Sequence, residues 1–514
     1  MKKVILVLSL TSLVLSASAK IEMGTPFSDG MVLQRGMKVP VWGKVVPELN
    51  SWLTRPVTVS FAGQTKTSTA DPVTGVWKVE LDPMEASKES RTMMVVEETG
   101  KWFVDLFCSP TDTVEIKDVL VGEVWFASGQ SNMECPIWGG NTRYRDGKGG
   151  LMTTMTCLPN VRYAKNEHRW SVEPTAAMSL GWRRFEPMSF ASCSPSAVAF
   201  YFARELYLAL DVPIGIVEAS WGGTNIDAWT PRCGYEDCDK SIQMVAEHPI
   251  KKDWKAADKI WTINGAHQQP TVLFNGMVSS WAPMAMRGFI WYQGCHNSGE
   301  HELYCAKMHV LYNGWAKAFA NPDLKLYFVQ LAPWTHNWTG ICAAQNRFVA
   351  EQKNAAIAVT SDVGNFDDIH PNDKEVVAKR LAVHALKRDY GFEIPEDDSP
   401  VFTAAAFGAD GTVTVDFAHV KDWYVYAPNR SREAAFEVAG TNGVWEAAKV
   451  VNWRQNKGKD GKTSDTDFID GSQIVVKSGK VATPVKVRYM GKPRMAGTLY
   501  NQASLPLGPF EAAK

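Results

Sequence analysis

The sequence predicts an α/β core with a mostly parallel five-stranded sheet, flanked by β-sandwich or jelly-roll segments at both ends. Between residues 119 and 394, apolar runs alternate with segments of helical periodicity. Short β-type runs separated by Pro, Gly, Asn and Asp fill 20–118 and 395–514. The chain of 514 residues is also long enough for about three domains of ordinary size.

Residues 1–19 have the pattern of a secretory signal. Two lysines precede an apolar run from Val4 to Leu15, and small residues end the segment at Ala19. The run is too short to span a bilayer, and no other segment is free of charges for long enough. We therefore expect cleavage near Ala19, a secreted or periplasmic protein and no membrane span.

The composition excludes two broad classes of protein. Lys and Arg number 54 and Asp and Glu 55, so the net charge of -1 gives no basis for a nucleic-acid surface. With 45% hydrophobic and 21% charged residues, large-scale disorder is excluded. The nine cysteines are an odd number, and Cys295 and Cys305 are close enough in sequence for a loop-bracketing disulfide.

The N-terminal segment 20–118 is predicted to be a small antiparallel β-sandwich domain. Its β-type runs are VPVWG at 39–43, VTVSFAG at 57–63 and WKVEL at 77–81.

Five apolar runs in 119–394 predict the strands of the core sheet. They are VLVGEVWFAS (119–128), PIGIVEAS (213–220), RGFIWYQ (287–293), KLYFVQLA (325–332) and AIAVTSD (356–362). Helical patterns lie between and after them, over 195–210, over 304–319 and from Pro371 to Gly391. Strands separated by helices predict right-handed crossovers and a buried parallel sheet.

In 395–514 the β texture returns, with TVTVDF at 412–417, IVVK at 474–477 and VKVRYM at 485–490. A second β-sandwich or jelly-roll domain is expected. The segment 456–471 is expected to be a solvated polar loop rather than a Ca²⁺ site, because it lacks EF-hand spacing.

Ligands of an open parallel sheet collect beyond the carboxyl ends of its strands, and chemistry-bearing residues stand at those positions. The strands are followed by Gly129-Gln130-Ser131-Asn132, by Trp221-Gly222-Gly223-Thr224, by Gln293-Gly294 and by Asp367-Asp368-Ile369-His370. A serine, a histidine, carboxylates and N–H donors are the groups that acyl transfer requires. A Gly-X-Ser after a strand is commonly only a turn, and a lone histidine is more often structural. Their joint placement favours an active site.

The motifs GEVWFASGQSNM, EASWGGTNIDAW, FIWYQG and DDIHPNDKEVVAKRLA resemble the sialate O-acetylesterase type of carbohydrate esterase, within the SGNH-hydrolase superfamily. The opening FSDGMVLQRGMKVPVWG and the closing VRYMGKPRMAGTLYNQASLPLGPF are similar to the same family. The resemblance implies an SGNH-like three-layer core, needing no cofactor or metal. It also implies a serine esterase that removes acetyl groups from an O-acetylated carbohydrate, either sialic acid or a plant polysaccharide.

The resemblance also implies roles for individual residues. Ser131 would be the nucleophile and His370 the base, and the oxyanion donors would be the Ser131 amide, the Gly222 amide and the Gln293 side chain. Asn132 and Trp221 would contact the substrate. The acid is either Asp367, as in the wider superfamily, or Asp368, as is frequent in this family. We expect Asp367, because a carboxylate three residues before the histidine can fold back to Nδ1.

Two features leave a second function open. Where the family usually has Glu after WYQG, this chain has Cys295, so a carboxylate that would fix the Gln293 carboxamide is missing. The chain also has 20 tryptophans, of which Trp138, Trp221, Trp229, Trp334 and Trp338 flank the motifs and are candidates for sugar stacking. The alternative is therefore a carbohydrate-binding protein with a degenerate, inactive esterase core. For Cys295 itself, a disulfide or a buried thiol is favoured over a nucleophile.

Overall fold

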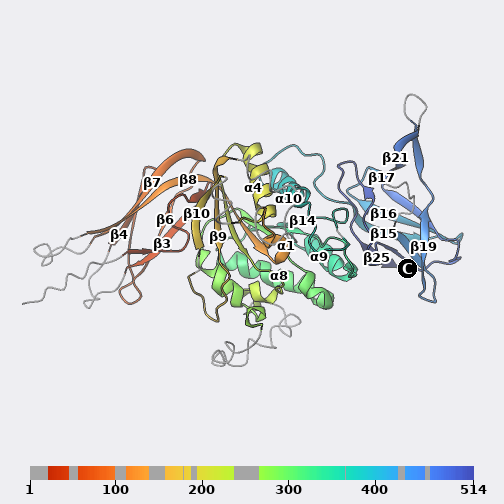
Figure 1. The fold of residues 1–514 in the computed structure, drawn as a ribbon, viewed down its shortest axis with the longest axis horizontal. Coiled ribbons are helices and arrows are strands. Elements are labelled where there is room, and N and C mark those ends of the chain that lie inside the picture. The colour runs from red at the N-terminus through yellow and green to blue at the C-terminus, as the bar shows by residue number, and fades with distance from the viewer. Residues whose placement is uncertain are drawn as a thin grey trace, which may run out of the picture.

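The computed structural model describes ten stretches of the chain, and the expected signal at 1–19 lies outside them. These stretches are 21–45, 56–98, 111–137, 157–176, 179–186, 194–236, 265–364, 366–425, 435–457 and 463–514. Figure 1 shows an N-terminal β region at one end, a helix-covered sheet in the middle and a C-terminal β region at the other end. No helix in the described stretches is both long and apolar enough to cross a membrane.

The central sheet contains the five strands that the sequence predicts, and all of them pair in parallel. Their order is β11 (Ile214–Ser220), β8 (Thr111–Gly129), β12 (Gly288–Tyr292), β13 (Lys325–Val329) and β14 (Ala355–Ala358). Every residue of β11, β12 and β14 is buried, as expected for strands covered on both faces. The strands formed by residues 158–220 lie on one side of β8, and the later strands β12, β13 and β14 lie on its other side, so the direction of winding reverses at β8.

Two strands of this sheet were not predicted. β9 (Leu158–Asn166) pairs in parallel with β11, and β10 (Ser179–Phe185) pairs antiparallel with β9. The sequence of β9, LPNVRYAKN, contains Pro, Asn and charged residues and has no regular apolar alternation. Four consecutive residues in the middle of β9 are buried, which does not give the alternation of apolar and polar residues by which a strand is recognised in a sequence.

Helices cover the two faces of the sheet, as Figure 1 shows. The helices α4 (Ala197–Leu210) and α10 (Lys374–Arg388) pack together on one side. The helices α8 (His301–Ala318) and α9 (Thr339–Glu351) pack together on the other. The opposite placement of α4 and α8 follows from right-handed crossovers that run in opposite directions from β8.

The start of α10 differs from the prediction. Pro371 was expected at the first helical position, but the helix begins at Lys374, with Asp373 as its N-cap. The Asp373 carboxylate accepts a hydrogen bond of 3.2 Å from the Val376 amide. The backbone amides in the first turn of a helix have no partner within the helix, and an N-cap aspartate accepts a hydrogen bond from one of them. The side chain of a proline cannot do this, which explains why the helix begins after Asp373 rather than at Pro371.

The N-terminal strands form two sheets around a shared core. One sheet is β1 (Ile21–Met23), β3 (Val39–Val45) and β6 (Val76–Leu81). The other contains β4 (Pro56–Phe61), β5 (Gln64–Thr69), β7 (Ser87–Glu98) and the first half of β8, which also pairs with β2 (Val32–Gln34). β8 crosses the expected boundary at 118/119 and continues into the central sheet, so one hydrophobic core extends through both regions.

The C-terminal β region has a hydrophobic core of its own. Its larger sheet has the order β15 (Val401–Phe407), β16 (Thr412–Ala418), β22 (Gln473–Lys477), β19 (Trp445–Val450), β18 (Phe436–Ala439), β23 (Lys486–Tyr489) and β25 (Phe510–Ala513). Its smaller sheet is β20 (Arg454–Lys457), β21 (Thr463–Asp470), β17 (Asp422–Val425) and β24 (Leu499–Tyr500). The expectation of a polar loop over 456–471 was therefore wrong for the residues of β20 and β21, which pair there as antiparallel strands, and residues 458–462 lie outside the described stretches.

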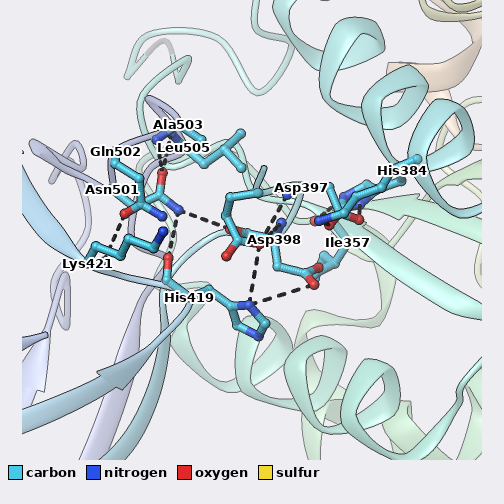
Figure 2. Close-up of polar contacts among 12 residues, drawn as sticks. Ile357, His384, Asp397, Asp398, His419, Lys421, Asn501, Gln502, Ala503 and Leu505 are labelled. Atoms are coloured by element: carbon cyan, nitrogen blue, oxygen red, sulfur yellow. Dashed lines mark hydrogen bonds and ion pairs between the residues drawn. The ribbon is translucent and has the colours of Figure 1, made fainter. Parts of the chain in front are cut away.

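A buried asparagine joins the C-terminal region to the segment after α10, and Figure 2 shows this junction. Asn501 is 1% exposed and its Nδ2 donates to the carbonyls of Asp398, at 3.1 Å, and His419, at 3.0 Å. The Asp398 carboxylate accepts two hydrogen bonds of 2.6 Å from Arg388, the last residue of α10. The junction therefore fixes the C-terminal region against the helix that follows the His370 segment.

Glu218, in the middle of β11, gives the fold a distinctive pH dependence. Its buried carboxyl accepts hydrogen bonds from the Ser196 amide at 3.0 Å and the Ser220 hydroxyl at 2.7 Å. Burial raises the pKa of Glu218 from 4.5 to about 8. Lys165 lies 3.5 Å from Oε1 but donates to a backbone carbonyl at 2.9 Å. The carboxyl is therefore protonated in the folded protein at pH values where the unfolded chain ionises it.

We expect Glu218→Gln to remove a loss of stability that the wild-type protein suffers as pH rises. Because the pKa of Glu218 is higher in the folded protein than in the unfolded chain, the protonated carboxyl contributes its full share of stability below pH 4.5. This contribution to the free energy of unfolding declines as pH rises toward about 8. The limiting slope is about 1.4 kcal/mol per pH unit. Urea unfolding of the variant and the wild type at intervals from pH 5 to 8 measures this slope of unfolding free energy against pH. Equal slopes for the variant and the wild type would show that Glu218 is ionised in the fold.

Candidate active site

Three strand ends meet at the same level of the sheet, and the candidate residues follow them. Gly129, the last residue of β8, lies in register between Ser220 of β11 and Tyr292 of β12. Its φ of +140° is a conformation that other residues rarely adopt, and a Cβ there would lie 2.3 Å from the Tyr292 carbonyl oxygen. Glycine thus allows the chain to turn sharply into Ser131, at the point where the winding of the sheet reverses.

Ser131 and His370 form a hydrogen-bonded pair. Ser131 is the first residue of the short helix α1 (Ser131–Glu134), and its Oγ lies 2.8 Å from His370 Nε2. On the other side of the ring, His370 Nδ1 lies 2.9 Å from Asp368 Oδ1, which also accepts the His370 amide at 3.0 Å. His370 is 7% exposed, and Ser131 is half-buried. A hydroxyl, an imidazole and a carboxylate in this order have the geometry of a catalytic triad.

The geometry corrects our expectation for Asp367. Its side chain is 88% exposed, and Oδ1 accepts a hydrogen bond of 2.8 Å from Arg494 of the C-terminal region. The turn before His370 is tight enough for the carboxylate two residues back to reach both the amide and the ring of His370. Asp368 therefore occupies the orienting position.

Gly222 lies directly against Ser131. A Cβ added to Gly222 would lie 3.1 Å from Glu134 Oε2 and 3.2 Å from the Cβ of Ser131, so a larger residue would crowd both side chains. The Gly222 amide donates a hydrogen bond of 2.6 Å to Glu134 Oε2. An anionic oxygen therefore already occupies the amide expected to bind the oxyanion. Sequence reasoning did not identify Glu134, whose only local signal is an acidic residue three positions after Ser131.

The indole of Trp221 is engaged by protein rings rather than open to a sugar. His168 stacks on it with ring centroids 4.3 Å apart, and His267 stacks on it at 5.0 Å. His168 also pairs with Glu134 at 2.8 Å, which links the stack to the Gly222 amide. Burial and the neighbouring His168 and His296 lower the pKa of His267. Trp221, which we expected to contact the substrate, is thus half-buried in a stack with two histidines.

The Gln293 carboxamide is held by the protein, which corrects its expected orientation. Its Nε2 donates to the Thr224 carbonyl at 3.0 Å and to Asn297 Oδ1 at 2.7 Å. Its Oε1 accepts from the Tyr304 hydroxyl at 2.7 Å. Both hydrogens of Nε2 are used in these contacts, so Gln293 does not offer one to an oxyanion in this conformation.

Asn297 replaces the carboxylate that the family usually has after WYQG. Its Oδ1 accepts from Gln293, and its Nδ2 donates to Glu300 Oε2 at 2.8 Å. Lys307 pairs with the same Glu300 oxygen and with Asp227, each at 2.7 Å. The substitution by Cys295 therefore does not leave Gln293 without support.

Cys295 is a free thiol, as is Cys305, so the disulfide suggested between them does not form. Burial raises the pKa of Cys295 to about 12. A thiol with this pKa is protonated at neutral pH and is a poor nucleophile. The buried-thiol interpretation is the one that the structure supports.

Asn132 links the two turns of the site instead of facing the substrate. It is 2% exposed, its Nδ2 donates to the Ile369 carbonyl at 3.2 Å, and its Oδ1 accepts from the ammonium of the buried Lys374. The same ammonium lies 5.3 Å from the centroid of the Tyr292 ring. This tie holds the turn of Ser131 against the turn of His370. Lys374 was missed because nothing local distinguishes it from a surface lysine of an amphipathic helix.

The other tryptophans named as sugar-stacking candidates differ in exposure. Trp229 is fully buried, Trp338 is 7% exposed and Trp334 is half-buried. Trp138 lies outside the described residues. Trp334 and Trp338 both line a cavity.

The chain is similar to known carbohydrate esterases. Sialate O-acetylesterase from Rattus norvegicus is 27% identical over 368 residues, which cover 61% of this chain and 64% of the rat protein. Sialate O-acetylesterase from Homo sapiens is 27% identical over 352 residues, which cover 61% of each chain. The matched part is thus less than two thirds of these mammalian proteins.

The structural comparison covers more of the chain. The crystal structure of a carbohydrate acetylesterase from Xanthomonas citri aligns with 96% of this chain and 100% of its own, with a TM-score of 0.76 and 28% sequence identity. The model of the family described as carbohydrate esterase, sialic acid-specific acetylesterase matches residues 121–387, which is more than half of the chain. The chain therefore belongs to the sialic acid-specific acetylesterase family of carbohydrate esterases.

Proposed function

We propose that this protein hydrolyses acetyl esters on sugars through an acetyl-serine intermediate. The observation that carries the proposal is the hydrogen-bonded series from Ser131 Oγ to His370 Nε2, at 2.8 Å, and from His370 Nδ1 to Asp368 Oδ1, at 2.9 Å. It lies at the strand ends where ligands of an α/β sheet bind, in a core of the SGNH-hydrolase type.

In the first half of the reaction, Ser131 Oγ attacks the acetyl carbon while its proton passes to His370 Nε2. The carbonyl oxygen becomes an oxyanion that accepts hydrogen bonds from the Ser131 and Gly222 amides. The C–O bond to the sugar then breaks, and the sugar oxygen takes the proton from His370. In the second half, His370 removes a proton from a water molecule as that water attacks the acetyl-serine. The bond between the acetyl carbon and Ser131 Oγ then breaks, Oγ takes the proton back from His370, and acetate is released. Asp368 keeps the His370 Nδ1 proton in place throughout.

The substrate, location and domain division belong to the same proposal. The leaving group is a sugar hydroxyl, of sialic acid or of a plant polysaccharide, and residues 1–19 direct the protein to the cell exterior or periplasm. The functional units are 20–118, 119–394 and 395–514. The family membership supports the carbohydrate substrate, and the signal-like pattern of 1–19 supports the location.

Chain-length dependence tests the proposal. We expect kcat/KM to be highest for acetate esters and to fall steeply for butyrate and octanoate esters, because a pocket for a methyl group excludes longer chains. A lipase-like groove would instead gain about 0.8 kcal/mol for each buried CH₂. Acetate release from O-acetylated sialic acid, xylan and pectin would identify the sugar. A rise of kcat/KM toward octanoate would contradict the proposal.

The alternative of an inactive carbohydrate-binding protein is less well supported. It was motivated by Cys295 in place of the usual carboxylate and by the 20 tryptophans. For the first of these, Asn297 provides a contact to Gln293. Ser131, His370 and Asp368 have also kept the geometry that catalysis needs.

We expect Glu134→Gln to raise kcat/KM for a chromogenic acetate ester by about three- to tenfold. The Glu134 carboxylate must leave the Gly222 amide before an oxyanion can bind there, and its charge opposes the charge of the oxyanion. A carboxamide is a weaker acceptor and carries no charge, and a gain of about 1.4 kcal/mol in the barrier is tenfold. Steady-state kinetics at pH 7 measure the change. A tenfold fall would show that the reaction needs the carboxylate.

A further inference from the structure

The loop that carries the Gly222 amide is residues 221–226, which follow β11, and we call it the Gly222 loop. Gly222 and Gly223 have no side chains, so neither residue can hold the loop through a side-chain contact. An oxyanion is stabilised well only by an amide that is already in position when the charge develops. The contacts that fix this loop therefore affect the reaction directly.

Thr224 and Ile226 fix the far end of the loop. Thr224 is fully buried, and its Oγ1 donates to the Trp221 carbonyl at 2.7 Å. Its carbonyl accepts a hydrogen bond of 3.0 Å from Gln293 Nε2. The Ile226 amide donates to Asn297 Oδ1, also at 3.0 Å. Two carboxamides from the chain that follows β12 thus hold the loop that follows β11.

Asn297 is the residue on which both contacts converge. Its Oδ1 accepts from the Ile226 amide and from Gln293 Nε2, the latter at 2.7 Å. Asn297 lies in the short helix η7 (Cys295–Glu300) and is 1% exposed. Because it is buried, its side chain can influence the reaction only through the residues that it contacts.

A buried cation supports Asn297 from the side away from the loop. Lys307 of α8 is 4% exposed, and its Nζ lies 2.7 Å from Glu300 Oε2 and 2.7 Å from Asp227 Oδ2. Glu300 Oε2 also accepts from Asn297 Nδ2 at 2.8 Å, and Asp227 directly follows Ile226. Hydrogen bonds to charged groups are stronger than those between neutral groups. The ammonium thus holds both the partner of Asn297 and the residue next to the loop.

We propose that Asn297 is a positioning residue for the oxyanion site. It holds the Gly222 loop so that the Gly222 amide lies beside Ser131. Lys307 and Glu300 keep its carboxamide in the required orientation, and the inward-turned Gln293 provides the second contact to the loop. A polar network whose members are all satisfied fixes one geometry, which an oxyanion donor requires. The inference rests on the proposed function, because it assigns a role within acetyl transfer.

We expect Asn297→Ala to lower kcat for a chromogenic acetate ester while KM stays within a factor of about two. Loss of a whole oxyanion donor costs about 10²- to 10³-fold in kcat, and this variant displaces the Gly222 amide without removing it, so we expect a loss of about tenfold. Steady-state kinetics measure the loss. Hydrogen exchange followed by mass spectrometry should be faster in residues 221–226 of the variant than in the wild type.

Asn354→Ala is the matched control. Asn354 is also a buried asparagine, which accepts from Lys325 Nζ at 3.0 Å and donates to the hydroxyl of Tyr312, in α8, at 3.2 Å. It directly precedes β14, so it lies at the amino ends of the strands, away from Ser131. We expect it to lower the free energy of unfolding but not kcat or the protection of residues 221–226. An equal fall of kcat in both variants, or an unchanged kcat in Asn297→Ala, would overturn the inference.

Glu300→Gln tests the same network at a more exposed side chain, and it decides the question if Asn297→Ala does not fold. The Glu300 side chain is 49% exposed. An uncharged carboxamide is a weaker acceptor for Asn297 and Lys307, so we expect kcat to fall about threefold with KM unchanged. Glu302→Gln makes the same change at an exposed residue of α8 and should have no effect. Equal kcat values for these two variants would contradict the inference. A wild-type protein that hydrolyses no acetate ester would instead overturn the proposed function.

Discussion

Replacing Ser131 with alanine is expected to lower acetylesterase kcat by on the order of 10³-fold or more and to leave the fold intact. The variant keeps the amides of residues 131 and 222, but it loses the hydroxyl that attacks the acetyl carbon. Ser131 is half-buried and its hydroxyl makes a hydrogen bond to His370, so the substitution removes one partly exposed contact and the expected loss of stability is small. Kinetics with a chromogenic acetate ester and thermal unfolding measure the two effects.

Ser220→Ala is the matched control for this experiment. Ser220 ends the neighbouring strand, and its buried hydroxyl donates to Glu218 rather than to His370. We expect its removal to affect stability more than kcat. If Ser131→Ala retained more than a tenth of wild-type kcat, or if the two variants lost kcat equally, Ser131 would not be the nucleophile.

The locations of residues that directly follow a core strand were predictable from the sequence. Ser131, Gly222 and His370 each follow a recognisable apolar run, and the carboxyl ends of parallel strands meet at one edge. The structure brings them together as expected, with the Cβ position of Gly222 against Ser131 and the His370 ring on its hydroxyl.

Residues whose orientation depends on distant partners were not predictable. Gln293 also follows a strand, but Tyr304 and Asn297 turn its carboxamide inward. Trp221 is stacked by His168 and His267, which are 53 and 46 residues away in the chain. Side-chain directions set by such contacts have no local pattern from which to read them.

The same distinction applies to the fold. The five buried strands of the core have long apolar runs, and the sequence located each of them. β9 was missed because four of its nine residues are polar or charged and interrupt the apolar pattern, and because it depends on β11 for its place in the sheet. β21 was missed because a strand in a small exposed sheet needs little apolar sequence, and TSDTDFID has only two large apolar residues.

The choice between the two candidate acids shows how one hydrogen bond changes a prediction. The chain offers adjacent aspartates, and both lie within reach of His370 by sequence distance alone. In the structure, Asp368 accepts hydrogen bonds from the His370 amide and ring, whereas Asp367 reaches toward Arg494. We therefore expect Asp368→Asn to lower kcat by about 10²- to 10⁴-fold. A carboxamide at this position permits the wrong tautomer of His370 and does not stabilise the imidazolium.

Asp367→Asn is the natural control, because it makes the same chemical change one residue earlier. An exposed ion pair contributes at most about 1 kcal/mol, so we expect its kcat for a chromogenic acetate ester to change by less than threefold. Measuring kcat for both variants over pH 5 to 9 separates the loss of His370 orientation from the loss of a negative charge near the site. Only Asp368→Asn should alter the pH profile of kcat, because that profile reports the protonation of the base, His370. The reverse ranking would transfer the orienting role to Asp367. Two mild effects would mean that backbone contacts alone orient His370, and that Ser131 and His370 act as a dyad.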